Sequence, residues 1–272
     1  MASSRPRAIL GLQVSQPLDD PRAELEALAH ATRRAARRQE TLGRPERKRP
    51  RPKLRAPAAG AARSAADVRA QAAAAPDLET LRACVSRCEA CGLSKTRTQT
   101  VFMDGKGTRR LMFVGEAPGA DEDRQNVPFV GRAGQLLTDI ITKGMGIPRE
   151  EVTIANVLKC RPPDNRDPTP AEKATCTPWL DRQIELVDPK VIVPLGRHAA
   201  MHVLGVEASM GAMRARVHPR GARQIVPTYH PAYLLRSPGE KKECWKDIQL
   251  AMAELGMRVP GRSDGASGSA GR

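Results

Sequence analysis

Short apolar runs alternate with longer amphipathic stretches over most of this 272-residue chain. In the longer stretches the apolar residues recur every three or four positions, which is the spacing of one helix face. Strands that alternate with helices pair in parallel, because each helix carries the chain back across the sheet. The pattern predicts an α/β fold of three layers, α/β/α, around a central four-stranded parallel sheet. The predicted strands are 111–115, 152–158, 190–196 and 224–228, and the predicted helices are 134–144, 170–187, 197–204 and 238–255, preceded by one that Asp77 caps.

The longest of these helices has a clear start signal. Thr169 is suited to the N-cap position, Pro170 to the first helical position and Glu172 to the third. A capping threonine and a glutamate three residues later satisfy backbone N–H groups that the first helical turn leaves unpaired. We therefore expect the helix to begin at residue 170.

The first 75 residues differ in composition from the rest of the chain. They hold 16 Lys and Arg against 7 Asp and Glu, with alanine runs and few large apolar residues. Such a segment cannot bury enough apolar surface to fold, so we predict a disordered basic arm over residues 1–75. The globular domain is expected at 76–258, and the Gly- and Ser-rich residues 259–272 are expected to form a flexible tail.

The formal net charge of +15 indicates a polyanionic partner, most often a nucleic acid. The basic arm would add contacts to DNA phosphates; the alternative is a low-complexity tail with no binding role. No run reaches the roughly 18 apolar residues of a membrane span, and the N-terminus lacks the apolar core of a secretory signal. We expect a cytoplasmic, nucleoid-associated protein with no membrane partner.

Chemically active side chains follow the predicted strands. Glu116 comes directly after the first strand, and Phe129 lies further along the same loop between proline and glycine. Asn156 stands near the end of the second strand, and His230 follows the fourth. Ligands of parallel sheets bind beyond the carboxyl ends of the strands, so we expect these four residues to share one pocket. The loops lack both the G-x-G-x-x-G and the G-x-x-x-x-G-K-[ST] pattern, which argues against a nucleotide cofactor.

This set of side chains suits the removal of a base from DNA. An aromatic ring can stack on a planar base, and an Asn amide offers one acceptor and one donor group to the edge of a pyrimidine. An imidazole near the base can stabilise negative charge on a departing ring. A carboxylate can orient water or stabilise a cationic sugar, as in glycoside cleavage. The base would first have to leave the helical stack.

Six cysteines in a chain with no secretory signal indicate metal ligation rather than disulfides. Cys88 and Cys91 form a C-x-x-C pair, and Cys160 and Cys176 supply a second pair. Four thiolates suit either zinc or a [4Fe–4S] cluster, and the spacing does not separate the two. Cys84, one helical turn before Cys88, is a rival ligand, whereas Cys244 is expected to be a core or surface thiol.

Four longer stretches of the sequence resemble the family-4 uracil-DNA glycosylases, the iron–sulfur members of their superfamily. The stretches are "GEAPGADED", "PFVGRAGQLL", "NVLKCRPPDNRDPTPAE" and "YHPAYLLR", and the resemblance extends from about residue 81 to 255. It implies a uracil-DNA glycosylase-like fold and hydrolysis of the N-glycosidic bond of flipped-out uracil, the first step of base excision repair. It also implies a structural [4Fe–4S] cluster on Cys88, Cys91, Cys160 and Cys176.

The resemblance implies a role for each matching position. Phe129 would stack on uracil, Asn156 would read its polar edge, and His230 would bind its O2 atom. Glu116 and the backbone of Ala117 would line the water side; better-known relatives have Asp at the position of Ala117, so water activation is less explicit here. Glu122 and Asn165 match polar positions near the pocket, and Leu234 matches the wedge that replaces the flipped base.

The resemblance implies uracil-containing DNA, single- or double-stranded, as the partner of a monomer, with a replication or repair protein as a further partner of the arm. Three other functions fit parts of the sequence: an inactive DNA-binding module of a polymerase, a related branch that traps uracil-DNA covalently, and a zinc-dependent nucleotide-binding protein. The second of these carries an extra histidine in a basic loop, and residues 161–169 contain none. His198 and His202 have helical spacing but no third ligand, so we interpret them as packing or solvated residues.

Overall fold

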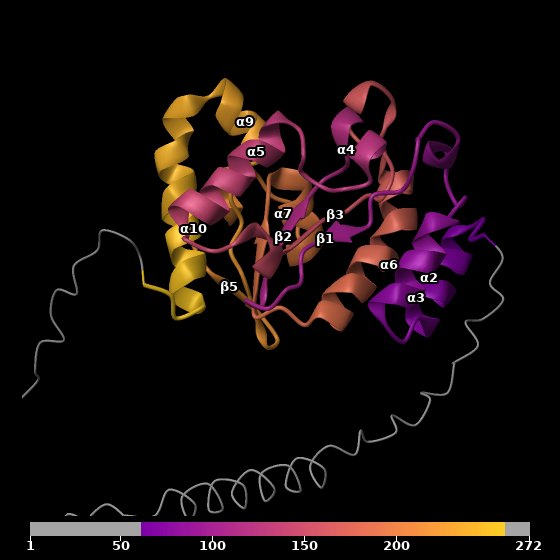
Figure 1. Cartoon of the computed structure of the whole chain (residues 1–272), viewed down its shortest axis with the longest axis horizontal. Helices are drawn as coiled ribbons and strands as arrows, with labels where there is room; N and C mark the ends of the chain where they lie inside the picture. Colours follow the sequence, from indigo (N-terminus) through magenta and orange to yellow (C-terminus); the bar gives the residue numbers. More distant parts are fainter. Residues whose placement is uncertain (1–60, 259–272) are drawn as a thin grey trace, which may run out of the picture. The chain divides into compact units, whose positions relative to one another are not determined.

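A computed structural model describes residues 61–258, so the predicted arm up to residue 60 and the predicted tail at 259–272 lie outside the described residues. The described part contains a six-stranded sheet of order β1-β3-β2-β4-β6-β5 (Figure 1). Its four central strands are parallel, as the sequence predicts, and antiparallel edge strands flank them. The strands are β1 (Met103–Asp104), β2 (Leu111–Gly115), β3 (Thr153–Asn156), β4 (Val191–Pro194), β5 (His218–Arg220) and β6 (Arg223–Ile225).

Helices cover both faces of this sheet, which confirms the predicted three layers. Alternate residues of β2 face opposite sides: Met112 and Val114 join one hydrophobic cluster, and Leu111 and Phe113 join the other. The first cluster contains residues of α2, α3, α6 and α7, and the second contains residues of α5, α9 and α10. The helices are α2 (Ala65–Ala74), α3 (Leu78–Ser86), α4 (Ala120–Gln125), α5 (Arg132–Asp139), α6 (Pro170–Val187), α7 (Arg197–Leu204), α8 (Met210–Met213), α9 (Pro231–Arg236) and α10 (Lys241–Glu254).

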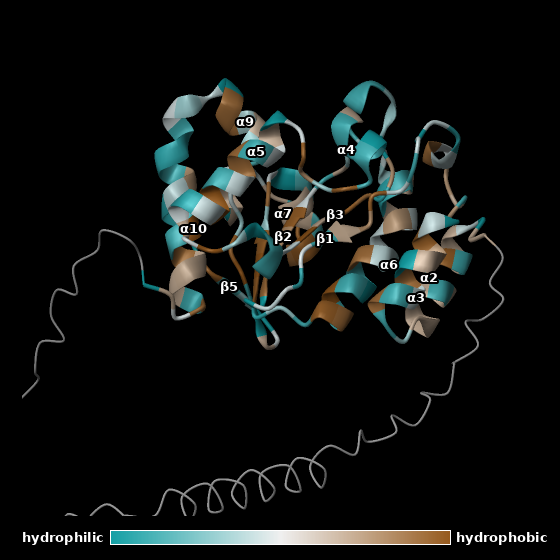
Figure 2. Ribbon diagram, in the orientation of Figure 1, coloured by the Kyte–Doolittle hydropathy of each residue, from teal (hydrophilic) through white to brown (hydrophobic). Residues whose placement is uncertain are grey.

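Apolar residues predominate in β2 and β4, whereas the helices are hydrophilic on their outer sides (Figure 2). This difference follows from burial, because strands covered on both faces carry mostly apolar residues. All residues of β2, β3 and β4 are buried. The edge strands were not predicted because they lack a buried apolar run: β1 has only two residues, and β5 is polar and largely exposed.

The start signals read from the sequence are confirmed. Asp77 caps α3 by accepting a hydrogen bond from the backbone N–H of Thr80 at 2.8 Å. Thr169 and Glu172 form a reciprocal capping box at the start of α6, with hydrogen bonds of 3.2 and 2.8 Å. Among residues 61–258, no helix is both long enough and apolar enough to cross a bilayer.

The folded region starts earlier than the predicted boundary at residue 75. Helix α2 packs against α6 and buries Val68 and Ala72. Arg182 of α6 donates two hydrogen bonds, of 3.0 and 2.8 Å, to the carbonyl oxygen of Ala75. The alanine-rich sequence of α2 has no amphipathic pattern, so it resembles a low-complexity segment. Its small side chains instead allow the two helices to approach closely.

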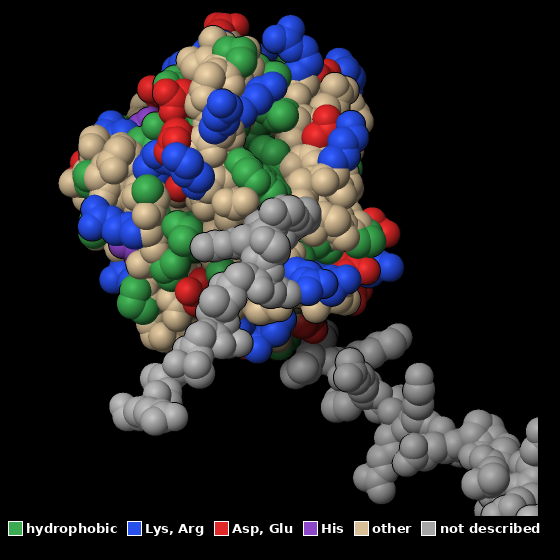
Figure 3. Space-filling view, turned by 90° about the vertical axis from the view of Figure 1, so that its left-hand side faces the viewer, with side chains coloured by type: hydrophobic (Ala, Val, Ile, Leu, Met, Phe, Trp, Pro, Cys, Tyr) green, Lys and Arg blue, Asp and Glu red, His purple; other side chains and the backbone are tan. Residues whose placement is uncertain are grey.

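The surface on the α10 side carries Lys and Arg side chains in several separate groups (Figure 3). Asp and Glu side chains lie among them, and a band of hydrophobic side chains lies between them. The positive charge on this face is therefore dispersed rather than gathered into one patch.

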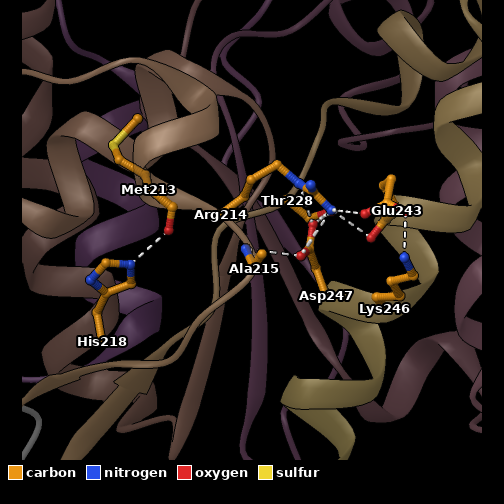
Figure 4. Close-up of polar contacts among 8 residues, drawn as sticks. All are labelled: Met213, Arg214, Ala215, His218, Thr228, Glu243, Lys246 and Asp247. Atoms are coloured by element: carbon orange, nitrogen blue, oxygen red, sulfur yellow. Dashed lines mark hydrogen bonds and ion pairs between the residues drawn. The ribbon is translucent and has the colours of Figure 1, made fainter.

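A buried ion pair joins α10 to the segment that precedes His230 (Figure 4). The Asp247 side chain is fully buried and accepts hydrogen bonds from Arg214 at 3.0 and 3.2 Å. It also accepts hydrogen bonds from the hydroxyl of Thr228 at 2.8 Å and from the backbone N–H of Ala215 at 3.1 Å. The Arg214 guanidinium lies over the ring of Tyr229. This network fixes the two residues that lead into His230.

Asp247→Ala should lower the free energy of unfolding by roughly 3–5 kcal/mol, because it removes the fully buried carboxylate that pairs with Arg214 and leaves only the longer contact with the partly exposed Glu243 at 3.5 Å. The measurement is chemical denaturation of the variant and the parent. Lys246→Ala is the matched control on the same helix: Lys246 pairs with Glu243 at the surface, so its loss should cost at most about 1 kcal/mol. Equal effects of the two substitutions would contradict the structural role of Asp247.

Candidate functional site

A cavity of about 560 Å³ lies where the parallel strands end, and helices α4, α5 and α9 gather around the same end of the sheet (Figure 1). Seven of the eight side chains predicted for catalysis and base recognition line this cavity, although they come from segments far apart in the sequence. The seven residues are Glu116, Ala117, Glu122, Phe129, Asn156, Asn165 and His230.

Gly115, the last residue of β2, allows two of these side chains to meet. A Cβ atom at this position would collide with both the Asn156 amide oxygen and the ring of Phe129. Phe129 itself has a positive φ of 56°, which is uncommon for a residue with a side chain. The backbone around it is thus shaped to turn its ring toward the cavity floor, 5.7 Å from the centre of the His230 ring.

Glu122 holds the loop that carries Phe129. Its carboxylate accepts hydrogen bonds from three backbone N–H groups, those of Gly119, Val130 and Gly131, at 3.1, 2.9 and 2.9 Å. Both carboxylate oxygens are therefore already engaged with the protein. The geometry favours a positioning role for Glu122 over direct contact with a ligand.

Asn156 presents a buried acceptor that has no protein partner. The residue is 1% exposed, and its Oδ1 atom makes no hydrogen bond within the described part of the chain. A buried polar atom without a partner costs on the order of 1–3 kcal/mol. Because Asn156 lines the cavity, a ligand N–H group placed there would satisfy this atom.

His230 is held as a neutral imidazole with its donor nitrogen toward the cavity. It caps α9, and its Nδ1 atom accepts a hydrogen bond from the backbone N–H of Ala232 at 3.1 Å. The ring proton must therefore be on Nε2. Burial, together with the nearby charge of Arg236, lowers the pKa of His230 to about 4. At neutral pH this side chain donates a hydrogen bond but carries no charge.

Glu116 is the carboxylate closest to the properties of a general base. Burial, together with the neighbouring Asp167, raises its pKa to about 7. Its Oε1 atom is buried without a hydrogen-bond partner in the described residues. His198, interpreted from sequence as packing or solvated, lies with its Nε2 atom 3.8 Å from this oxygen. Sequence spacing could not reveal this proximity, because the two residues follow different strands.

Asn165 and Ala117 lie less deeply in the same cavity. Asn165 is exposed, with a φ of 54°, and its Oδ1 atom accepts a hydrogen bond from Arg161 at 2.9 Å. Its amide nitrogen offers a donor at the rim. Ala117 contributes backbone next to Glu116.

The prediction that Leu234 is a surface wedge is wrong in this structure. Its side chain is 1% exposed and belongs to the hydrophobic cluster formed with α5 and α10. The exposed apolar side chains of α9 are those of Tyr233 and Leu235. The motif alone does not show which side of a six-residue helix faces the core.

The four predicted metal ligands line a second, much smaller pocket. Cys88 and Cys91 follow α3, Cys160 follows β3, and Cys176 lies on α6. Cys84 and Cys244 do not line this pocket, so the structure favours Cys88 over its rival Cys84. Arg97 donates to the Cys160 sulfur at 3.2 Å, and the backbone N–H of Lys159 donates to the Cys176 sulfur at 3.4 Å.

Four cysteines around one small pocket supply the thiolates that either a zinc ion or a [4Fe–4S] cluster requires. A second group of possible metal ligands within residues 61–258 is Glu116, Asp167 and His198, whose ligand atoms all lie within 4.8 Å of one another.

Lys159 is a buried charged residue next to the cavity whose contacts the sequence did not predict. It is 1% exposed, and its ammonium donates to the Asn156 carbonyl oxygen at 2.6 Å and to Gln183 Oε1. Burial lowers its pKa to about 8. It connects the backbone of Asn156 to the neighbourhood of the cysteines. The only signal in the sequence is a lysine directly after a predicted buried strand.

Comparison with known protein families matches residues 102–249 to the uracil DNA glycosylase superfamily. The chain is 47% identical over 155 residues to the Type-4 uracil-DNA glycosylase of Thermotoga maritima, covering 56% of this chain and 80% of that protein. It is 41% identical over 180 residues to the Type-4 uracil-DNA glycosylase of Sulfurisphaera tokodaii, covering 63% and 82%. It is 40% identical over 183 residues to the Type-4 uracil-DNA glycosylase of Saccharolobus solfataricus, covering 64% of this chain and 84% of that protein. The family match contains every residue of the cavity wall named above.

Glu116→Gln should change how stability depends on pH. The folded protein holds the Glu116 proton up to a pKa of about 7, above the ordinary value of 4.5, so the parent loses stability as pH rises between these values and then levels off. The variant lacks this loss, and its advantage should grow to at most roughly 3 kcal/mol. The melting temperatures of both proteins from about pH 5 to pH 8 provide the test. Parallel curves would show that Glu116 titrates normally.

Proposed function

The chain belongs to the uracil-DNA glycosylase superfamily, and we propose that it hydrolyses the N-glycosidic bond of flipped-out uracil in DNA, the step that starts base excision repair. One observation carries this proposal: the Phe129 ring, the unpartnered Asn156 amide oxygen and the neutral His230 imidazole share one cavity. An aromatic ring, an amide and a donor nitrogen complement the face, the polar edge and the O2 atom of uracil. The relatives named as uracil-DNA glycosylases support the same reaction.

Base recognition would rest on Phe129 and Asn156. Uracil would stack on the Phe129 ring, its N3–H would donate to Asn156 Oδ1, and its O4 would accept from the same amide. Cytosine has no N3–H and carries an amino group in place of O4, so it would leave the buried acceptor unsatisfied and place a donor against the amide NH₂. A site with buried polar groups rejects a ligand that leaves them unpaired.

His230 would stabilise the departing base. As the bond between N1 and the sugar breaks, negative charge spreads to O2, and the Nε2–H of His230 would donate to that atom. A neutral donor suits this step, because the pKa of His230 stays far below neutrality and the proton is not transferred to the base. Glu116, with the Ala117 backbone beside it, would orient the attacking water, and Asn165 would donate a hydrogen bond from the rim.

The DNA strand would be held at the cavity mouth. Arg132 and Arg236 line this mouth and would contact phosphates on either side of the flipped nucleotide. The exposed Tyr233 and Leu235 of α9 are placed to contact the bases that remain stacked. We further propose that the basic N-terminal residues act as an arm that adds phosphate contacts or binds a replication or repair protein, and that the enzyme acts as a monomer.

The four cysteines would hold a [4Fe–4S] cluster. The donor set of Cys88, Cys91, Cys160 and Cys176 fits the group, as do the N–H groups of Arg97 and Lys159 that point at two of the sulfurs. Hydrolysis of a glycosidic bond requires no electron transfer, so the cluster would be structural. It would join the segment after α3 to the loop between β3 and α6.

Asn156→Ala and His230→Ala should each slow uracil release about 10²- to 10³-fold, since each removes a hydrogen bond to the reacting base. The measurement is single-turnover cleavage of a single-stranded oligonucleotide that contains one uracil. His218→Ala is the control, because His218 bonds only to the Met213 carbonyl oxygen in its loop. A parent protein that binds the oligonucleotide but releases no uracil would instead be an inactive DNA-binding module.

Cys91→Ser should abolish the visible absorbance of an anaerobically purified sample and reduce its iron and sulfide content, because three thiolates hold a four-iron cluster less well than four. Cys84→Ser and Cys244→Ser are matched controls: both are buried cysteines outside the pocket, and both should retain the cluster. Stoichiometric zinc without sulfide in the parent would contradict the assignment.

A further inference from the structure

His198 lies behind the catalytic cavity, against Glu116. It is the second residue of α7 and lines a separate cavity of about 470 Å³ together with Lys173 of α6. Its Nε2 atom is 3.8 Å from Glu116 Oε1 and 3.9 Å from Asp167 Oδ2. Because Glu116 and Asp167 line the catalytic cavity, the imidazole contacts the wall between the two cavities.

Lys173 determines which nitrogen of His198 carries the proton. Its Nζ atom is 2.9 Å from His198 Nδ1. An ammonium group has three N–H donors and no acceptor, so Nδ1 must accept this hydrogen bond. The ring proton is then on Nε2, which faces Glu116 and Asp167. Burial lowers the pKa of His198, and the charge of Lys173 lowers it further, so the ring is neutral at neutral pH.

The spacing of the three groups suits one water molecule. The facing atoms of Glu116, Asp167 and His198 all lie within 4.8 Å of one another, whereas 3.8 Å, the distance from Nε2 to Glu116 Oε1, is too long for a direct N–H···O hydrogen bond. A water molecule among them would accept from His198 Nε2–H and donate to the two carboxylates. Such a water has three polar partners, a typical number for an ordered internal water.

A metal ion fits the same three residues poorly. A histidine that binds a metal normally donates its other ring N–H to an acceptor. Here the other nitrogen, Nδ1, faces the donor Lys173, so metal binding through Nε2 would require a ring with no proton at all. The Lys173 charge would also repel a cation.

We propose that His198 is a positioning residue: through one water molecule its Nε2–H holds Glu116 Oε1, and this contact keeps the Glu116 carboxylate ionised and oriented toward the cavity. The inference rests on the proposed function. It concerns the activation of water, for which this chain has Ala117 at the position where better-known relatives have Asp. Lys173 contributes by fixing the ring tautomer. His202, one helical turn further along α7, takes no part, because it pairs with Asp181 at 2.9 Å.

In the reaction, the bond between C1′ and N1 of the uracil nucleotide breaks, and N1 keeps the electron pair. The oxygen of a second water molecule in the cavity bonds to C1′, and its proton passes to the Glu116 oxygen that His198 does not hold. Uracil leaves as an anion that accepts the hydrogen bond of His230. The contact with His198 matters only while Glu116 is ionised.

The charged groups around Glu116 give the direction of the pH effect. Asp167, on the loop before α6, raises the pKa of Glu116, and Lys173 of α6 lowers it; Arg197 and Glu207 face His198 from either end of α7. A hydrogen bond to a carboxylate favours its charged form. Loss of the His198 donor should therefore raise the pKa of Glu116.

The test is the pH profile of single-turnover uracil release by the full-length protein with its cluster. For the parent, the rate should rise with pH to a plateau. For His198→Ala, the midpoint of the profile should move to higher pH. If the midpoint moves by about one pH unit, the rate at pH values below the midpoint should be about tenfold lower than that of the parent. The plateau and the affinity for the oligonucleotide should change little, because His198 does not contact DNA. His198→Gln, which restores an N–H donor, should bring the midpoint part of the way back.

Two control variants and the addition of Mn²⁺ distinguish a role of His198 from the alternatives. His202→Ala should give the parent profile, and His198→Ala should have no further effect in a Glu116→Gln background, because the two residues act together. A profile of His198→Ala that superimposes on the parent would overturn the inference while leaving the proposed function intact. A rate that depends on added Mn²⁺ would overturn it in favour of a metal ion. If the parent releases no uracil, the proposed function itself fails.

Discussion

The register of three parallel strands determines where the chemistry of this protein can occur. β2 lies between β3 and β4, with Gly115 beside Asn156 and Val114 beside Pro194. The carboxyl ends of all three strands therefore finish at one level, and the residues after them form a single wall. A slip of one residue would turn Asn156 to the opposite face of the sheet. Burial of the central strands on both faces holds this register, and Gly115 then provides the space in which an amide and an aromatic ring can meet.

In two histidines at this end of the sheet, a donor that bonds to Nδ1 fixes the ring proton on Nε2. The backbone N–H of Ala232 occupies Nδ1 of His230, and the ammonium of Lys173 occupies Nδ1 of His198. Burial lowers the pKa of both rings. Each imidazole consequently presents one N–H group without adding a positive charge. A cationic ring would hold a carboxylate or a departing base more strongly, but it would cost more to bury and would repel a sugar that develops positive charge.

The sequence predicts the parts of this fold that obey local rules. The central strands, the capped starts of α3 and α6, and the shared position of Asn156, Phe129 and His230 all follow from apolar periodicity and the geometry of parallel sheets. Contacts that depend on tertiary packing do not follow. Helix α2 is ordered because small residues fit against α6, and Leu234 is buried because the core lies on its side of α9. His198 and Glu116 follow two different strands, β4 and β2, and their contact cannot be predicted from their spacing in the sequence.

The cysteine pocket and the cavity that contains Asn156 share a structural element. Lys159 lies between them: its backbone N–H donates to the Cys176 sulfur, and its ammonium donates to the Asn156 carbonyl oxygen. Gln183 of α6 accepts from the same ammonium and donates to the Phe102 carbonyl oxygen at 3.0 Å. A buried lysine is stable only where such partners stay in place. Movement of Cys160 or Cys176 would therefore shift Lys159 and, through it, the backbone that aims the Asn156 amide. On this basis the proposed cluster, with no part in the chemistry, would still influence how precisely the Asn156 amide is placed.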